Sequence, residues 1–191
     1  MSEPRSDADA PWGLLESRLI HDGRIVRLSI DRVRFPDGSE GELELIRHRG
    51  AAAVLPVVGK AETRKAEVLL LHQYRYAAGG ELYEVPAGVR QGEESWEACA
   101  RRELEEETGW RAGHLKPLTR IYTTPGFTDE VIHLFLATEL CPGSARLDAD
   151  EFLEVVRVPF SQALEWVHSG RIVDGKSVAL LLYAATWELP A

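Results

Sequence analysis

The amino-acid sequence predicts an α+β fold, and three patterns along its 191 residues carry that prediction. Runs in which apolar and polar residues partly alternate come first, as in strands with one solvated face. Nearly continuous apolar runs follow, and these are typical of strands that are covered on both faces. One amphipathic helix and two closing helices complete the set. A chain of this length most simply forms one domain.

The first strands follow a loose leader. Residues 1–12 are rich in Ser, Asp, Ala and Pro and predict a poorly ordered segment. Short strands are expected at 14–20, 24–35 and 42–48. Residues 36–39 (Pro-Asp-Gly-Ser) favour a tight turn, so the last two strands should form a hairpin. The single domain is then expected over 13–191, with 13–48 as an N-terminal antiparallel strand extension.

The central strands and the helices follow in order. Nearly continuous apolar runs predict strands at 51–58 and 68–74. Further strands are expected at 82–85, 118–123, 131–138 and 152–158. A helix is expected over 95–108, because Ser95 suits the N-cap, apolar residues recur every four positions and Gly109 supplies a stop. Closing helices are expected at roughly 161–169 and 176–189.

The composition excludes several classes of protein. A net charge of -9 leaves no basic field for nonspecific nucleic-acid binding. The N-terminus lacks the apolar core of a signal peptide, and no apolar run reaches the length of a membrane span. We therefore expect a cytoplasmic protein without a membrane partner. Cys99 and Cys141 are far apart and lack metal-ligand spacing, so they favour reduced thiols over a disulfide.

The most informative stretch is residues 88–110, where carboxylates gather on the predicted helix. Glu103, Glu106 and Glu107 stand at i, i+3 and i+4, so they share one face and repel one another unless a cation is present. Oxygen ligands suit Mg²⁺, which usually shares its shell with substrate phosphates. The alternative is a solvated acidic face that Arg101 and Arg102 stabilise at i+4 spacing.

Residues 88–110 read as Gly-x5-Glu-x7-Arg-Glu-apolar-x-Glu-Glu-x-Gly-apolar, which resembles the signature box of the Nudix hydrolases at every specified position. The order of the predicted strands is also similar to the Nudix fold. The resemblance implies an α/β/α sandwich, in which a mixed sheet lies between helices. It also implies hydrolysis of a nucleoside diphosphate linked to another group, with Mg²⁺ as cofactor and Mn²⁺ as a substitute.

The same resemblance implies the roles of the box residues. Glu103 and Glu107 correspond to the main metal ligands, and Glu106 to a residue that ligates metal or activates water. The backbone carbonyl of Ala87 joins the metal shell. Arg102 would orient a neighbouring glutamate, with Glu84 as its further partner, unless it only forms a surface ion pair.

A second set of residues is similar to bacterial ADP-ribose pyrophosphatases. The loop at 123–130 (Thr-Thr-Pro-Gly-Phe-Thr-Asp-Glu) resembles theirs, as do Arg75, Glu84 and the segment 170–177. Glu130 on this loop is a candidate general base that competes with Glu106, and the alternative is an ordinary loop acid. Predicted substrate contacts, each weighed against a plain structural role, are Arg24, Ile25, Arg75, Glu84, Gly126 and Phe127.

The resemblance implies cleavage of ADP-ribose to AMP and ribose 5-phosphate. Other nucleoside diphosphate sugars, such as GDP-mannose or ADP-glucose, are alternative substrates. An alternative of another class is a non-catalytic nucleotide sensor, which a complete box disfavours. In some bacterial relatives Arg24 and Ile25 reach the partner subunit's site, so the resemblance also implies a homodimer, with residues 13–48 as a dimerisation element.

Overall fold

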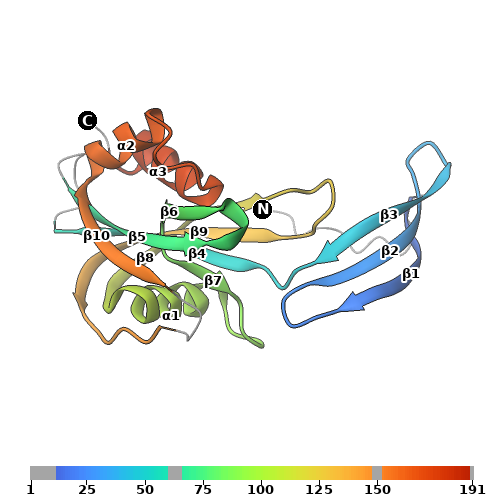
Figure 1. Ribbon diagram of the computed structural model, residues 1–191, viewed down its shortest axis with the longest axis horizontal. Coiled ribbons are helices and arrows are strands. Elements are labelled where there is room, and N and C mark those ends of the chain that lie inside the picture. Colours follow the sequence, from blue (N-terminus) through green and yellow to red (C-terminus); the bar gives the residue numbers. More distant parts are fainter. Residues whose placement is uncertain (1–11, 60–65, 148–151, 190–191) are drawn as a thin grey trace. The chain divides into compact units, whose positions relative to one another are not determined.

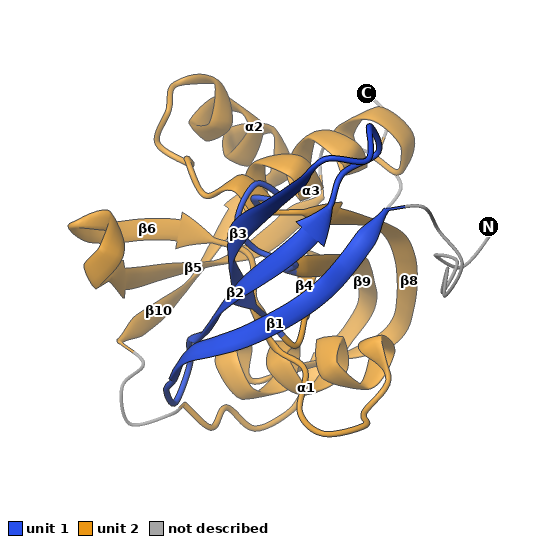
Figure 2. Cartoon of the chain, turned by 90° about the vertical axis from the view of Figure 1, so that its right-hand side faces the viewer, with its two compact units in different colours: residues 1–48, 124–130 blue, residues 49–123, 131–191 orange. Residues whose placement is uncertain are grey.

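The structure, a computed structural model, describes residues 12–59, 66–147 and 152–189 (Figure 1). The leader expected at 1–12 lies outside the described residues, apart from Trp12. The chain divides into two compact units, shown in two colours in Figure 2. Unit 1 holds residues up to 48 together with 124–130, and unit 2 holds residues 49–123 and 131–191. The single domain expected over 13–191 stays a prediction.

Unit 1 contains a three-stranded antiparallel sheet in the order β1-β2-β3. Its strands are β1 (Gly13–Asp22), β2 (Arg27–Arg34) and β3 (Glu40–Arg47). The predicted hairpin is confirmed, because Arg34 pairs with Glu40 and the Phe35 N–H donates to the Ser39 carbonyl at 2.8 Å. Gly38 takes the left-handed conformation of this turn, with φ at 85°.

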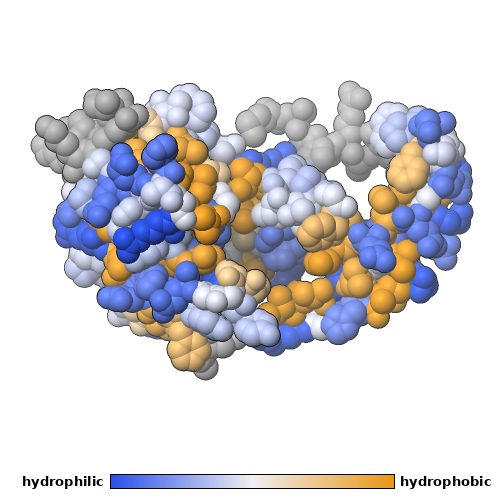
Figure 3. Space-filling model, turned by 45° about the horizontal axis from the view of Figure 1, so that its top comes forward, coloured by the Kyte–Doolittle hydropathy of each residue, from blue (hydrophilic) through white to orange (hydrophobic). Residues whose placement is uncertain are grey.

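The sheet of unit 1 leaves apolar side chains on its surface, and Figure 3 shows them as orange atoms among polar ones. β1 is exposed along its whole length. The exposed apolar residues of β1 and β3 are Leu14, Leu15, Leu19, Ile20 and Leu43. β3 also meets the loop at 124–130, where the Ile46 N–H donates to the Phe127 carbonyl at 2.8 Å. This contact explains why that loop belongs to unit 1.

Unit 2 is built on a seven-stranded mixed sheet. The strands are β4 (Ala51–Val58), β5 (Glu67–Arg75), β6 (Gly80–Glu84), β7 (Ala87–Val89), β8 (Trp110–Tyr122), β9 (Val131–Pro142) and β10 (Leu153–Pro159). The main order is β10-β5-β4-β9-β8, with β6 paired to β5 and β7 paired to β4. β4 and β9 run parallel, and the other pairs are antiparallel.

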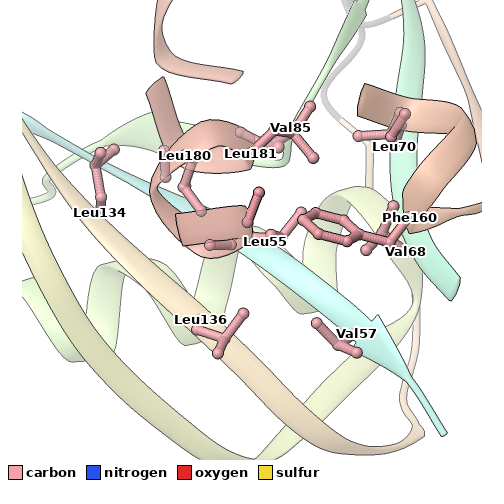
Figure 4. Packing of buried hydrophobic residues seen from close by; sticks show 14 of the residues in the cluster. Leu55, Val57, Val68, Leu70, Val85, Leu134, Leu136, Phe160, Leu180 and Leu181 are labelled. Atoms are coloured by element: carbon pink, nitrogen blue, oxygen red, sulfur yellow. The ribbon is translucent and has the colours of Figure 1, made fainter. Parts of the chain in front are cut away.

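Helices cover both faces of this sheet (Figure 1). They are α1 (Trp96–Thr108), α2 (Phe160–His168) and α3 (Gly175–Trp187). Alternate residues of β4 enter two cores: Val54 packs with Leu104 of α1, whereas Leu55 packs with Phe160 and Leu181 of the other helices (Figure 4). The continuous apolar run at 51–58 is therefore explained, and the α+β sandwich is confirmed. None of the described helices is both long and apolar enough to cross a membrane.

The ends of α1 were predictable from the residues there. Ser95 Oγ accepts a hydrogen bond from the Ala98 N–H at 3.1 Å, as an N-cap should. Gly109 ends the helix in the left-handed conformation, with φ at 72°, and its N–H donates to the Glu105 carbonyl. The helix therefore starts and stops where the sequence predicts.

Two strands differ most from the prediction. β8 begins at Trp110 and not near 118, because pairing with β9 extends it through Gly113 and Pro117, which are poor strand formers. β8 ends the strand order, and an edge strand tolerates a proline that lacks an N–H. The short β7 was not predicted at all, since three residues carry no periodicity and only their pairing with β4 defines them.

Candidate active site

The three glutamates predicted as metal ligands lie on α1 in unit 2. Glu103 and Glu107 are buried, with 8% and 3% of their surfaces exposed, and the Glu106 side chain keeps 37% exposed. The apolar stripe of the helix, which includes Ala100 and Leu104, lies beside them and carries them into the interior. Because a buried carboxylate is costly unless it is paired, its partners define the site.

Arg102 holds three carboxylates at once. Its Nη2 donates to Glu94 Oε1 at 2.7 Å, and its Nη1 donates to Glu103 Oε1 at 2.6 Å and to Glu106 Oε2 at 3.0 Å. Nη2 also donates to the Val89 carbonyl at 3.1 Å, which ties the guanidinium to β7. Arg102 thus contacts neighbouring glutamates as expected, and its part in catalysis stays a prediction.

The charges of this cluster stabilise one another. The hydrogen bond from Arg102 is the main cause that lowers the pKa of Glu94 to about 2. Burial alone would lower the pKa of Arg102, but its bonds with Glu94, Glu103 and Glu106 raise it above its usual range. Both groups therefore stay charged at neutral pH.

Strand β7 brings the backbone against the same carboxylates. The Ala87 N–H donates to Glu107 Oε2 at 2.9 Å. At Gly88 an added Cβ would overlap the Glu103 carboxylate, so only glycine allows the strand to approach this closely. The box glycine is thereby explained sterically. The Ala87 carbonyl remains a predicted metal ligand.

The chemistry of this donor set fits a divalent cation. Every side chain in it other than Arg102 offers carboxylate oxygen, the ligand that Mg²⁺ prefers. Arg102 supplies one positive charge against Glu94, Glu103 and Glu106, so the cluster carries an excess of negative charge. Among the described residues, no group of three His, Cys, Asp or Glu side chains forms a ready-made metal site. The ligand set therefore stays a prediction.

Arg75 and Glu84 form a second cluster on β5 and β6. Arg75 makes a bidentate pair with Glu84, from Nε to Oε1 at 2.7 Å and from Nη2 to Oε2 at 2.9 Å. Lys176 Nζ donates to the same Oε2 at 2.5 Å. The expectation that Glu84 supports Arg102 is wrong, because Glu84 is bonded instead to Arg75 at the end of β5 and to Lys176 at the start of α3.

Glu130, the candidate base on the loop, lies in unit 1. Its Oε1 is 3.5 Å from His48 Nδ1, and its N–H donates to Thr128 Oγ1 at 3.2 Å. The neighbouring Asp129 accepts hydrogen bonds from the His48 N–H at 2.7 Å and from Arg47 at 3.2 Å. The loop is thus fastened to the end of β3, and the role of Glu130 as a base stays a prediction.

The other predicted substrate contacts also belong to unit 1. Arg24 and Ile25 lie in the turn between β1 and β2, and 68% of Ile25 is exposed. Gly126 and Phe127 lie in the turn of the loop at 124–130, and 51% of Phe127 is exposed. These residues therefore lie on the surface of their unit. Their role as substrate contacts stays a prediction.

Several residues of the candidate site had no assigned role in the sequence. Glu94 stands at a specified position of the box pattern, and the structure pairs it with Arg102. Lys176 lies in the segment at 170–177, but nothing in the sequence names Glu84 as its partner.

A pocket of about 230 Å³ lies beside Glu106, and its lining residues are Arg102, Glu105, Glu106, Ser144 and Arg146.

Comparisons with known proteins show which family the chain resembles. A family model described as NUDIX domain matches residues 47–181. The ADP-ribose pyrophosphatase of Bacillus subtilis (strain 168) is 38% identical over 166 residues, which cover 86% of this chain and 87% of that protein. The methanol dehydrogenase activator of Bacillus methanolicus is 35% identical over 176 residues, with 91% and 92% covered.

Two further comparisons bear on substrate and fold. The GDP-mannose pyrophosphatase of Escherichia coli (strain K12) is 38% identical over 161 residues, which cover 76% of this chain and 82% of that protein. A crystal structure of an ADP compounds hydrolase superposes with a TM-score of 0.78 at 21% identity, covering 95% of this chain and 96% of that one. At this identity the superposition speaks for the fold alone.

Proposed function

The chain belongs to the Nudix hydrolase family, and on that premise we propose that it hydrolyses the pyrophosphate bond of ADP-ribose to give AMP and ribose 5-phosphate. The observation that carries the proposal is the set of carboxylates that Arg102 gathers beside Gly88. The name of the Bacillus subtilis relative supports the choice of substrate. A complete signature box argues against a non-catalytic nucleotide sensor.

Glu103, Glu106, Glu107 and the Ala87 carbonyl would hold Mg²⁺, for which Mn²⁺ is a substitute. When bound, such an ion neutralises charge on the diphosphate and lowers the pKa of a coordinated water. Arg102 restrains the side chains of Glu103 and Glu106, so their oxygens are oriented before substrate arrives. Gly88 leaves space for the Glu103 carboxylate.

The remaining steps fall to side chains that accept a proton or bind phosphate. We propose that Glu106 or Glu130 accepts the proton of the attacking water on a carboxylate oxygen. Arg75 would donate to a phosphate oxygen of the substrate. Arg75 bonds to Glu84 through Nε and Nη2. Its Nη1 takes no part in these two bonds and would be the donor to the phosphate.

GDP-mannose is the second candidate substrate, and the Escherichia coli relatives of that name are the observation that favours it. The two candidates share the diphosphate and differ in base and sugar, so the carboxylate cluster serves both equally. ADP-glucose is a further alternative. Specificity would then depend on groups outside the cluster.

The test is to compare kcat/KM for ADP-ribose, GDP-mannose and ADP-glucose with Mg²⁺, and to identify the products by mass spectrometry in ¹⁸O-labelled water. The proposal expects ADP-ribose to have the highest kcat/KM, with AMP and ribose 5-phosphate as products. The position of ¹⁸O reports which phosphorus is attacked. Equal or faster turnover of GDP-mannose would replace the proposed substrate.

We also propose a cytoplasmic homodimer. The exposed apolar residues of β1 support association, because apolar residues gathered at a surface often mark a binding site. Two free cysteines support a reducing compartment. Light scattering after gel filtration would test the dimer, and a monomer at micromolar concentration would contradict it.

A further inference from the structure

The start of α3 reaches into the sheet of unit 2 through Lys176. Its Nζ donates to Glu84 Oε2 at 2.5 Å and lies 3.0 Å from Asp174 Oδ2. Only 11% of the Lys176 side chain and 3% of the Glu84 side chain are exposed. A lysine this buried is costly, so its contacts must compensate for lost hydration.

Lys176 and Arg75 share one carboxylate. Arg75 contacts both oxygens of Glu84, and Lys176 contacts one of them. Burial tends to raise the pKa of Glu84, but the bonds from Arg75 and Lys176 outweigh it, and the pKa is lowered. With Asp174 included, the cluster contains two cations and two anions. Glu84 therefore stays ionised. Because Lys176 neutralises part of its charge, Arg75 keeps positive charge that can attract an anion.

The position of Lys176 is fixed by the beginning of its helix. Asp174 caps α3, and its Oδ2 accepts hydrogen bonds from the Ser177 N–H at 3.0 Å and from Ser177 Oγ at 2.5 Å. Ser177 Oγ in turn accepts a bond from the Val85 N–H at 2.8 Å. The residue after Glu84 is thus bonded to the helix that presents Lys176, so this geometry is set by the fold and not by a mobile side chain.

The outer part of Arg75 remains accessible. Its side chain is 43% exposed, whereas that of Glu84 is nearly inaccessible. Arg75 is thus anchored on its inner side and open on the other, as a residue that binds an anion requires. An arginine with no anchored carboxylate behind it would sample many rotamers and lose entropy on binding.

We propose that Lys176 is a positioning residue for substrate binding, which acts through Glu84 to hold the Arg75 guanidinium ready for a phosphate. Lys176 itself touches no substrate. The inference rests on the proposed function, because it gives Arg75 a phosphate to bind. It predicts that the charge of Lys176 affects KM more than kcat, since the reacting groups lie in the other cluster.

Lys116 offers a matched control. It pairs with Glu188 at 2.6 Å and so fastens the other end of α3 to β8, but it does not contact Glu84. A general loosening of α3 would therefore follow from K116Q as well as from K176Q. A positioning role predicts an effect of K176Q alone.

The first readout is steady-state kinetics with the best substrate of the nucleotide-sugar panel. We expect K176Q to raise KM about tenfold, which is about 1.4 kcal/mol of binding, with kcat within about threefold of the wild type. K176R, which keeps the charge, should restore most of the lost affinity, and K116Q should resemble the wild type. Equal KM values in K176Q and the wild type, or equal losses in K116Q and K176Q, would overturn the inference.

The second readout needs no substrate. The NMR signal of the Arg75 Nε–H group, assigned by its loss in R75K, should shift and broaden in K176Q and persist in K176R and K116Q. An unchanged signal in K176Q would overturn the inference whatever the substrate is. If the wild type hydrolyses no member of the panel, the proposed function fails, and the Arg75 signal still decides the role of Lys176.

Discussion

Unit 2 contains two arginine-centred clusters of opposite design. Arg102 faces three carboxylates with a single positive charge, whereas Arg75 and Lys176 together balance Glu84 and Asp174. An excess of negative charge favours the arrival of a cation. A balanced cluster with one accessible guanidinium favours an anion. We infer that charge balance, and not the residue types alone, distinguishes the proposed metal site from the proposed phosphate-binding cluster.

The largest expected effect is on catalysis by the Arg102 cluster. Replacing Glu106 by Gln should lower kcat by about 10²–10⁴-fold, because the variant loses a metal ligand or the general base. The fold should remain intact, since Glu106 is partly exposed. Stopped-flow or steady-state assays at saturating Mg²⁺ would measure the loss. Turnover equal to that of the wild type would refute the metal-centre assignment.

The next largest effect is the loss of stability in R102Q, which should depend on the concentration of Mg²⁺. R102Q leaves Glu94, Glu103 and Glu106 without their shared partner, so we expect the free energy of unfolding to fall by about 3 kcal/mol. Added Mg²⁺ should recover part of this loss, because a cation can take the place of the guanidinium charge. Urea unfolding with and without MgCl₂ tests both statements. A loss that Mg²⁺ does not change would show that the cluster only stabilises the fold.

A steric change should give a smaller effect in the same place. G88A puts a methyl group where the Glu103 carboxylate lies, so either that side chain or β7 must move. We expect a loss of about 1–3 kcal/mol in stability and a weaker affinity for Mg²⁺. Thermal unfolding and Mn²⁺ titration would measure these changes. The matched control is G126A, where an added Cβ meets no atom within 4 Å and should leave the melting temperature unchanged.

The Arg75 cluster should make the free energy of unfolding depend on pH in acid. Because the pKa of Glu84 is lowered from its usual 4.5 in the fold, its contribution to stability is complete above pH 4.5. The contribution is lost as the pH falls through the lower, folded-state value. E84Q should therefore show a shallower loss of stability in acid than the wild type. Urea unfolding as a function of pH would test this, and parallel curves would contradict it.

The smallest effect is expected where a glutamate of α1 lies outside both clusters. Glu97 forms an exposed i,i+4 pair with Arg101 at 3.0 Å. E97Q should change the free energy of unfolding by less than about 0.5 kcal/mol and leave kcat unaltered. A large loss of activity in E97Q would mean that carboxylates outside the Arg102 cluster also contribute to catalysis.

Much of the fold was predictable because local chemistry determines it. The caps at Ser95 and Gly109 and the turn at 36–39 rely on nearby residues, and both are confirmed. β7 and the first half of β8 were missed because pairing with distant strands decides them. The division into two units was also not predictable, since it depends on the contact of the loop at 124–130 with β3.

The candidate site was predictable in its residue types and less so in its partners. The spacing of Glu103, Glu106 and Glu107 along one helix brings them together by geometry alone. The partner of Glu84 was predicted wrongly, because both Arg75 and Lys176 reach it through tertiary structure. The sequence also gives no account of how Glu130 and Phe127 meet a substrate.

The central claim is that the carboxylates of α1 bind divalent cations. Isothermal titration of the purified protein with Mg²⁺ or Mn²⁺, with and without a non-hydrolysable ADP-ribose analogue, tests it most directly. We expect saturable binding that strengthens with the analogue and is abolished in E103Q. Absence of heat in all titrations of the wild type, or identical binding by E103Q, would contradict it.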